Sequence, residues 1–441
     1  MRAFLVLGDL NQGRYAFIDY TDMNSYNEGV CVVKYFKFSI NASILTIFVA
    51  VLFPATSQAI PAFARQANMT CSTCHTAWPS LNAFGRQYKE HGYRIGHLST
   101  PNKTISKDLK WNESLPVSVL LVARPYDKKG SGETKLRALH EVELMVAGPM
   151  GEKFSSFIEI EAEDEDLNAR GFETGIPSAA LTYNADEAAH LQVSWGSITW
   201  FDPYNSYSNH LRMTRGGSAV YDQSFGGADN GGKIKSARQN ITVYGRPSPN
   251  LFYGVSVSGD AGDAEGEEGS TITARVAFDV MPSLTIGALV ISGTANASST
   301  ADTVGIVGGV PAVIAGSTTP ERDYSRTAID LQSEVAGFTF NAVFLTATDD
   351  NAAATAEVDN DVFSLQALYT VKNGGRVTWA PLIRLDSYET GGGAVDVDEI
   401  TLGVNYYFTE NVRGMLEFWD RDSSAAGKDD DRVTVQVIAA F

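Results

Sequence analysis

Apolar and polar residues alternate with a period of two over most of the chain, from about residue 115 to the C-terminus. In the segment Ile400–Phe408, one face presents Ile, Leu, Val, Tyr and Phe, and the other presents Thr, Gly, Asn and Tyr. In the next segment, Leu416 and Phe418 flank Glu417. An aliphatic face opposite a face that carries charges is typical of a transmembrane β-barrel strand, which meets lipid on one side and water on the other.

Such segments recur about every 20 residues, as expected for strands of about 9–11 residues joined by turns. We count about 16 of them, each expected to be one barrel strand. They begin near Leu115, Leu139, Phe154, Ser178, Leu191, Ala237, Leu251, Ser270, Ser283, Tyr324, Phe338, Val362, Val377, Glu399, Val412 and Arg432. Short connections and long polar ones, such as 202–235, predict periplasmic turns at one end and outer loops at the other. The predicted fold class is all-β, an antiparallel transmembrane barrel over residues 111–441; the alternative is a soluble β-sandwich or propeller.

The first part of the chain contains one strongly apolar run. Lys34 and Lys37 precede the run Ile44–Phe53, and the small-residue stretch Pro54–Ala59 follows it. This order is typical of a secretory signal, and a run of about 10 residues is too short for a membrane-spanning helix. We predict that residues 1–59 are leader and signal peptide, cleaved at their end; the alternative is an uncleaved anchor.

Charge and cysteine content narrow the functional classes. The 441-residue chain has a formal net charge of −18, which makes nucleic acid a poor partner. Of its three cysteines, Cys31 lies in the predicted leader, so the exported chain would keep only Cys71 and Cys74. These two belong to the run Cys71-Ser72-Thr73-Cys74-His75, and Cys-x-x-Cys-His is the pattern of covalent c-type haem attachment.

The spacing of this motif suits a porphyrin. Two thiols three positions apart can each bond one vinyl group, and the adjacent His75 is then available as proximal ligand of the iron. A structural zinc site would need two more Cys or His ligands, a redox dithiol would accompany a βαβ unit, and a simple disulfide would leave His75 unexplained. We therefore expect one covalent haem c, bound by Cys71, Cys74 and His75, in an N-terminal cytochrome segment over residues 60–110.

A helix is expected within this segment, over Pro79–His91. Phe84 and Tyr88 share one face at helical spacing, and Gly92 suits the C-terminal cap. His91 is the candidate for the distal ligand of the haem iron, and a packing histidine is the alternative. A segment of about 50 residues has little core of its own, so we expect the haem to supply much of it and the periplasmic mouth of the barrel to supply the rest. Arg86 and Arg94 are candidates for pairing with haem propionates, or are simply solvated.

Acidic residues cluster on the inward phase of two neighbouring strands. They are Glu141, Glu143, Glu159, Glu161 and Glu163. Oxygen ligands suit hard divalent cations, and a negative lumen concentrates cations. The alternative is a charged porin lumen without a specific site.

Four short stretches carry a resemblance to a known family. They are Pro61–Gln66, Cys71–His75, Leu81–Arg86 and Gly92–Tyr93. The chain resembles the fused monohaem cytochrome–porins, whose best-known members are outer-membrane iron oxidases of iron-oxidising bacteria. The resemblance implies that a periplasm-facing cytochrome and a barrel of about 16 strands form one electron conduit in the outer membrane. It also implies extracellular Fe(II) as the donor and a soluble periplasmic cytochrome as the acceptor.

Three functional hypotheses follow. The first is an outer-membrane c-type cytochrome–porin, an iron:cytochrome oxidoreductase that oxidises extracellular Fe(II) and passes the electrons to a periplasmic acceptor. The second is an electron conduit for a different extracellular donor or acceptor. The third is a solute porin with a haem-bearing plug.

Overall fold

The computed structural model forms two compact units, Met1–Pro54 and Ala55–Phe441, which we describe separately. In the first unit, β1 (Phe4–Asp9) and β2 (Arg14–Asp19) pair as an antiparallel hairpin. The structure describes residues 4–9, 14–19, 61–95, 102–104, 110–112, 115–130, 132, 134–164, 171–208, 212–223, 232–265, 270–299, 303–307, 310–314, 318–351 and 353–441. The apolar run of the predicted signal and its cleavage site lie outside these residues.

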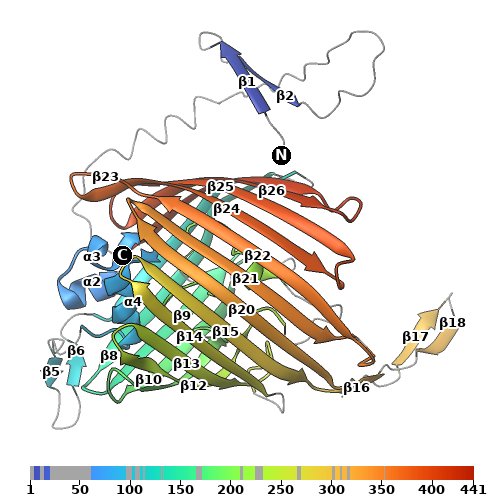
Figure 1. Ribbon diagram of the computed structural model, residues 1–441, viewed down its shortest axis with the longest axis horizontal. Coiled ribbons are helices and arrows are strands. Elements are labelled where there is room, and N and C mark those ends of the chain that lie inside the picture. Colours follow the sequence, from blue (N-terminus) through green and yellow to red (C-terminus); the bar gives the residue numbers. More distant parts are fainter. Residues whose placement is uncertain are drawn as a thin grey trace. The chain divides into compact units, whose positions relative to one another are not determined.

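A closed antiparallel barrel dominates the second unit (Figure 1). Its elements are β7 (Val117–Lys129), β8 (Thr134–Met150), β9 (Phe154–Glu163), β10 (Glu173–Asn184), β11 (His190–Ser197), β12 (Ala237–Ser248), β13 (Leu251–Ser258), β14 (Thr271–Met281), β15 (Leu284–Ala295), β20 (Arg322–Val335), β21 (Phe338–Asp350), β22 (Glu357–Tyr369), β23 (Val371–Asn373), β24 (Arg376–Thr390), β25 (Val395–Tyr407), β26 (Val412–Ser423) and β27 (Asp430–Ala440). β22 and β23 are two parts of one strand, because both pair with β24 and only Thr370 separates them. The barrel therefore has 16 strands, and β27 closes it against β7. The predicted fold class is confirmed.

The alternation in the sequence corresponds to the two faces of the barrel wall. On β26, the side chains of Leu416 and Phe418 are exposed on the outer face, while Arg413 and Glu417 are buried inside. The C-terminal Phe441 is 56% exposed, in line with its outward phase. Because a closed barrel pairs each strand on both sides, it presents no open sheet edge.

The alternation places the start of β8 at Leu139, whereas the strand begins at Thr134. The reason is a bulge against β7. Val122 pairs with Glu141 and Arg124 pairs with Arg137, so three residues of β8 lie opposite one residue of β7. A bulge interrupts the period of two, and the sequence pattern therefore misses the part of the strand that precedes it.

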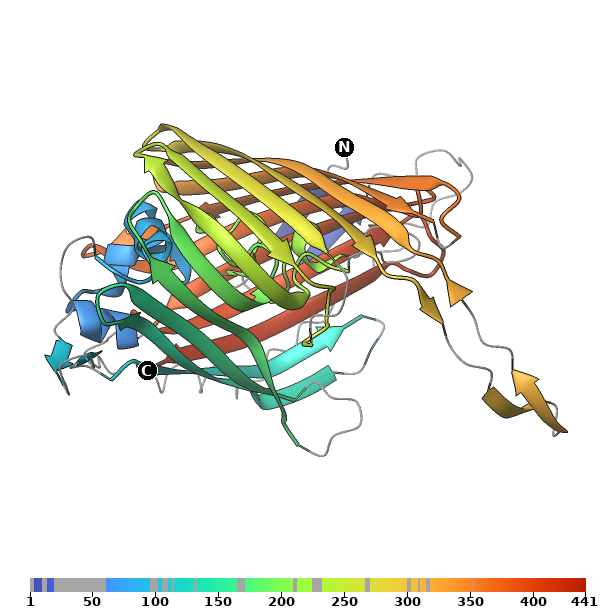
Figure 2. The same ribbon diagram turned by 90° about the horizontal axis from the view of Figure 1, so that it is seen from below.

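The two ends of the barrel differ in their connections. Tight turns join the strands at one end, at residues 151–153, 249–250, 282–283, 336–337 and 374–375. Longer connections join them at the other end, where a loop carries β16 (Ser298–Ser299), β17 (Thr303–Val307), β18 (Val310–Ile314) and β19 (Thr318–Thr319). Figure 2 shows the β17–β18 hairpin projecting from the end opposite the N-terminal helices.

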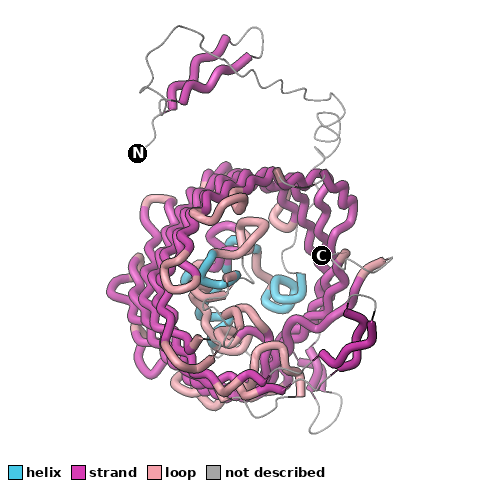
Figure 3. Tube along the Cα trace, turned by 90° about the vertical axis from the view of Figure 1, so that its right-hand side faces the viewer, coloured by secondary structure: helices cyan, strands magenta, loops and turns pink. Residues whose placement is uncertain are grey.

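The N-terminal segment lies at the tight-turn end, partly within the ring of strands (Figures 1 and 3). It consists of α2 (Pro61–Ala67), α3 (Cys71–Cys74), β3 (His75–Ala77), β4 (Ser80–Leu81) and α4 (Ala83–Glu90), followed by the hairpin of β5 (Asn102–Thr104) and β6 (Lys110–Asn112). Within the described ranges, no helix has the length and apolar character needed to cross a membrane. Hydrogen bonds from Ala62 to Ser118 and from Cys71 to Glu410 join the segment to this end of the barrel.

Helix α4 is shorter than the predicted Pro79–His91. It begins at Ala83 because Asn82 caps it, accepting a hydrogen bond from the Gly85 N–H at 2.9 Å. Pro79 lies instead between β3 and β4. The expected C-terminal signal is confirmed, since Gly92 has a φ of 63° directly after the cap residue His91.

The long connection between β11 and β12 folds into the lumen instead of forming an outer loop as expected. Figure 3 shows helices and loops inside the ring of strands. It carries α5 (Ala219–Asp222). Its buried Tyr207, Val220 and Ile234 share one apolar cluster with strand residues such as Leu345 and Val362. Apolar side chains within this Gly- and Asp-rich stretch drive the inward fold, since burying them against the wall removes them from water.

Candidate functional site

The N-terminal segment is attached to the mouth of the barrel by hydrogen bonds. At the start of α2, the Ala62 N–H donates to Ser118 Oγ of β7 at 3.1 Å. At the start of α3, the Cys71 N–H donates to the Glu410 carboxylate, in the turn before β26, at 3.1 Å. The first strand of the barrel and the turn before β26 therefore both hold the segment that carries the cysteine motif.

A capped turn holds α3 against α4. The Asn82 N–H donates to the Cys74 carbonyl at 2.9 Å, and Asn82 Nδ2 donates to the Thr73 carbonyl at 3.0 Å. Gly85 allows the two helices to approach, because a Cβ at this position would overlap the Cys74 carbonyl oxygen. One short polar residue and one glycine thus set the position of Cys74.

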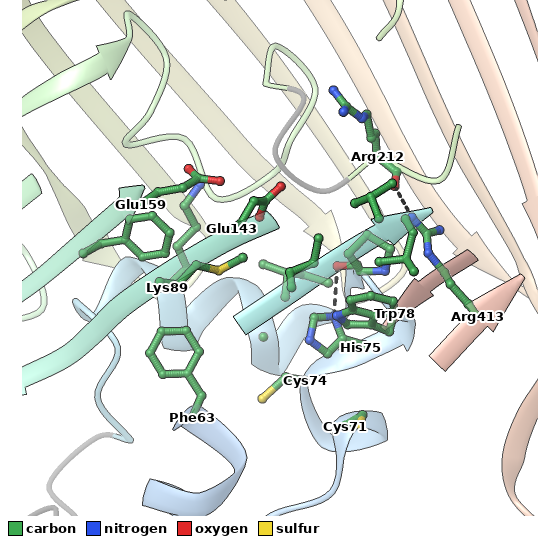
Figure 4. A pocket seen from close by; sticks show the side chains of 18 of the residues that line it. Phe63, Cys71, Cys74, His75, Trp78, Lys89, Glu143, Glu159, Arg212 and Arg413 are labelled. Atoms are coloured by element: carbon green, nitrogen blue, oxygen red, sulfur yellow. Dashed lines mark hydrogen bonds between the residues drawn. The ribbon is translucent and has the colours of Figure 1, made fainter. Parts of the chain in front are cut away.

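Both thiols and the His75 ring border one cavity of about 570 Å³ (Figure 4). This volume lies within the range of about 300–1,000 Å³ that small-molecule and cofactor sites occupy. Apolar and aromatic side chains form much of its wall: Phe63, Trp78, Leu81, Phe84, Tyr88 and Leu120. The structure therefore brings the predicted residues Cys71, Cys74 and His75 together on a pocket that suits a large, flat, mostly apolar cofactor.

The His75 ring is held in one orientation. Its Nδ1 lies 2.9 Å from the Pro79 carbonyl oxygen, which accepts the ring N–H and leaves Nε2 for a ligand. Burial lowers the pKa of His75 to about 4, so the ring is neutral at ordinary pH. A neutral imidazole with Nδ1–H bound to a backbone carbonyl is the form in which histidine binds a metal.

The two cysteines are free thiols in a desolvated setting. Burial raises the pKa of Cys74 to about 11, and burial together with the Glu410 carboxylate raises the pKa of Cys71 further. Such thiols remain protonated at neutral pH and have little reactivity as nucleophiles or redox dithiols. The setting fits attachment sites better than a catalytic thiolate.

His91 is not brought to this cavity. It follows α4 as the cap residue, and its ring lies 6.4 Å from the ring of His190, centroid to centroid. Among the described residues, the methionines Met69 and Met145 border the cavity and His91 does not. The sequence pattern favoured His91 because helical spacing places it near Tyr88, but the cap turns its side chain toward β11.

Arg86 and Arg94 are occupied elsewhere. Arg86 forms an ion pair with Glu334 at 2.9 Å, and Arg94 donates to the backbone carbonyls of Glu152 at 2.7 Å and Gly151 at 3.1 Å. Neither residue borders the cavity. Their role is to fix the N-terminal segment to the tight turns.

The opposite wall of the cavity is strongly charged. All five glutamates noted in the sequence border it. Arg212 and Trp200 from the inward-folded loop reach it as well, and Figure 4 shows Arg212, Glu143 and Glu159 across the cavity from Cys74. The sequence pattern does not indicate a role for Arg212 or Trp200, because nothing in a loop of this composition shows that it folds inward.

The final part of the chain matches a family model. Residues 372–441 match the family of phosphate-selective porins O and P. No curated protein matches the chain.

Several solved structures share the fold of the barrel. OmpT, an outer membrane protein of Vibrio cholerae, is 11% identical, with a TM-score of 0.52 over 74% of this chain and 98% of that one. The anion-selective porin of Comamonas acidovorans is 13% identical, with a TM-score of 0.51 over 74% and 98%. Salmonella typhi OmpF, solved with daunomycin, is 14% identical, with a TM-score of 0.51 over 77% and 100%.

The family match, residues 372–441, lies within the barrel and does not include the N-terminal segment. None of the proteins named in these comparisons is described as a cytochrome. The chain has the fold of outer-membrane porins, with a cavity at its tight-turn mouth that the cysteine motif borders.

Proposed function

We propose that the chain is an outer-membrane barrel of the porin type that holds one covalent haem c at its periplasmic mouth and carries electrons across the outer membrane. The observation that supports this is the arrangement of Cys71, Cys74 and His75 around one cavity, with His75 Nδ1 bound to the Pro79 carbonyl. The proposal thus combines the barrel fold, which the porin structures share, with the cofactor motif of the sequence, which borders this cavity.

Each residue of the motif has a separate task. Cys71 and Cys74 would form thioethers to the porphyrin, and His75 Nε2 would bind its iron. When bound, haem c supplies a one-electron redox couple. Phe63, Trp78 and the other apolar side chains exclude water from the pocket, and such a shell is one of the features by which a protein tunes a redox potential.

The position of the cavity suggests the direction of exchange. Tight turns face the periplasm in outer-membrane barrels, so the motif would lie on the side of a soluble periplasmic cytochrome, the proposed acceptor. The proposed donor is extracellular Fe(II), which the resemblance to cytochrome–porins implies. Iron is best oxidised outside the cell because the ferric product precipitates near neutral pH.

The test is covalent haem on the full-length chain. Protein from the outer-membrane fraction should carry a haem stain that survives denaturing electrophoresis, and adding Fe(II) to intact cells should reduce it. Cys74→Ala should remove most of the stain, whereas Ser72→Ala, inside the motif but not an attachment residue, should keep it. Absence of Soret absorbance in the wild-type protein would end the proposal.

A solute porin is the second candidate, and the porin comparisons favour it. The family matched by residues 372–441 is described as phosphate-selective, so phosphate is the solute to test. Measurable phosphate conductance in planar bilayers by a wild-type chain without haem would favour this function over the first.

A further inference from the structure

A second cluster of ligand-bearing side chains lies on β8 and β9, beside the cavity. The imidazole of His140 and the carboxylates of Glu141 and Glu163 have ligand atoms within 4.8 Å of one another. Glu141 and Glu163 also border the cavity that the thiols border. The cluster does not include the cysteine motif.

The bulge in β8 brings these three residues together. Glu141 and Glu163 are direct partners in the register of β8 and β9. His140 is adjacent to Glu141 and would face the other way in a regular strand. It belongs to the three residues of β8 that lie opposite one residue of β7, and a bulge of this kind redirects a side chain.

The buried imidazole of His140 distinguishes this cluster from an ordinary group of acidic side chains. Its side chain is 0% exposed, and its Nε2 forms no hydrogen bond. That atom lies 3.5 Å from a Glu163 oxygen and 3.8 Å from a Glu141 oxygen. A buried polar atom without a hydrogen bond is costly, and a ligand between it and the two carboxylates would remove the cost.

The other ring nitrogen of His140 is already used. Nδ1 lies 2.6 Å from an Asp164 oxygen, so its N–H donates to that carboxylate. Arg137 lies 3.3 Å from the same nitrogen and 3.5 Å from Asp164, and it therefore supports the acceptor. A carboxylate that orients a histidine and leaves Nε2 for a metal is a common arrangement around protein metal ions.

The charges on the wall also favour a cation. Two pairs of glutamates face each other across β8 and β9, Glu141 with Glu163 and Glu143 with Glu161. Like charges directly opposite one another destabilise a sheet. Arg212 interacts electrostatically with Glu141, Glu143 and Glu163, which reduces this repulsion in the absence of an ion.

We infer that His140 Nε2, Glu141 and Glu163 bind one divalent first-row transition-metal ion. A neutral imidazole and two carboxylates balance a charge of two, and a mixed nitrogen and oxygen donor set suits Fe(II), Zn(II) or Co(II) better than Mg(II). Bonds of about 2.0–2.2 Å in a tetrahedral site place ligand atoms roughly 3.4 Å apart. The distances from His140 Nε2 to the Glu163 and Glu141 oxygens, 3.5 Å and 3.8 Å, are close to this value. The remaining coordination position would face the cavity.

Metal binding at this site does not depend on haem. If the bound ion is the electron donor, this role of the site rests on the proposed function. The binding of the ion does not. Experiments on haem-free protein therefore separate the two ideas. The Cys71→Ala/Cys74→Ala double variant is the suitable full-length chain.

The first experiment is equilibrium dialysis of the purified full-length protein in detergent against Co(II), with metal counted per chain. We expect one tightly bound Co(II) in the wild type and in the double cysteine variant. In the latter, visible d–d bands should indicate a nitrogen-containing site of low coordination number. A wild type that binds no stoichiometric Co(II) would overturn the inference.

Matched variants identify the site. His140→Gln should weaken binding by at least about 10-fold, whereas His190→Gln, which alters another buried histidine whose Nε2 has no hydrogen bond, should not. Glu163→Gln should weaken binding and the neighbouring Glu161→Gln should not, although both remove one carboxylate from the same wall. Equal losses in the two glutamate variants would indicate only diffuse attraction and would overturn the site.

The folding of the barrel and its haem content are measured on the same samples. Heat-dependent gel mobility reports whether each barrel has folded, and Glu163→Gln provides the test if His140→Gln does not fold. Haem-stained protein without stoichiometric Co(II) would refute the metal site and leave the proposed function. Stoichiometric Co(II) without haem would refute the proposed function and leave the metal site.

Discussion

Gly85 is the residue whose lack of a side chain lets α4 pack closely against the cysteine motif. A methyl group there would overlap the Cys74 carbonyl oxygen and push α3 away from α4. We expect Gly85→Ala to destabilise the N-terminal segment by about 1–3 kcal/mol and to lower the haem-to-protein ratio. Gly175→Ala is the control, because a Cβ at Gly175 would meet nothing within 4 Å. Unchanged haem content in Gly85→Ala would contradict the close approach of the two helices.

Lys89 on α4 provides a pH-dependent test. Burial lowers its pKa from 10.5 to about 8, although Asp202 acts in the opposite direction. Between these two values the unfolded chain binds more protons than the native one, so the free energy of unfolding rises with pH from about 8 to about 10.5. The destabilising effect is complete below pH about 8 and disappears above pH about 10.5.

Lys89→Met removes this titration. We expect urea unfolding at pH about 8 and about 10.5 to show a rise in wild-type stability that the variant lacks. The difference between the two proteins cancels the contributions of tyrosines that titrate in the same range. A rise of equal size in Lys89→Met would show that another group is responsible.

At this scale, the sequence alone predicts that residues close in the chain lie near one another. Cys71, Cys74 and His75 are close in the chain, and any conformation of so short a run keeps them near one another. Helix periodicity says where His91 lies around the helix, but it does not say that the cap turns its side chain toward His190. The metal cluster needed the bulge at His140, which alternation alone does not reveal.

At the scale of elements, two ion pairs attach helix α4 to the barrel, Arg86–Glu334 and the more deeply buried Arg246–Glu90. Arg246 of β12 donates to both Glu90 oxygens, at 2.7 Å and 2.9 Å, and also pairs with Asp279 at 2.7 Å. Breaking a buried ion pair by removing one member typically costs about 3–5 kcal/mol, and the cost here should be smaller because Arg246 keeps its pair with Asp279. We expect Glu90→Gln to loosen the N-terminal segment.

Limited proteolysis of the folded protein measures this loosening as faster cleavage between residues 61 and 95. The control is Lys129→Gln, which removes an ion pair of 2.7 Å with Asp430 whose lysine is 53% exposed. Such a surface pair contributes only about 0–1 kcal/mol. Equal cleavage rates for Glu90→Gln and the wild type would show that the segment is held by its other contacts.

Strand identity was predictable because each strand carries its own alternating pattern. Strand ends were less predictable. At Thr134, for example, backbone pairing with β7 continues beyond the point where the alternation of apolar and polar residues stops. The start of α4 was missed for a similar reason. Proline suits the first turn of a helix, but Asn82 offers a better cap three residues further on.

At the scale of the whole molecule, closure and strand number followed from counting segments, while the contents of the lumen did not. The inward fold of the β11–β12 connection depends on contacts between Tyr207 or Val220 and strands far away in the chain. No local pattern encodes such contacts. The N-terminal segment and this connection both occupy the interior, so this barrel differs from an open pore (Figure 3).

Deleting residues 61–95 tests which of the two occupants limits passage through the barrel. The deletion removes α2 to α4 and one wall of the cavity, so ionic conductance in planar bilayers should rise clearly above that of the wild type. It should remain below that of a chain that also lacks residues 203–233, because Tyr207 and Val220 pack against the opposite wall. A conductance that rises only when 203–233 is removed would identify the inward loop as the constriction. The N-terminal segment would then serve to hold the cavity rather than to close the barrel.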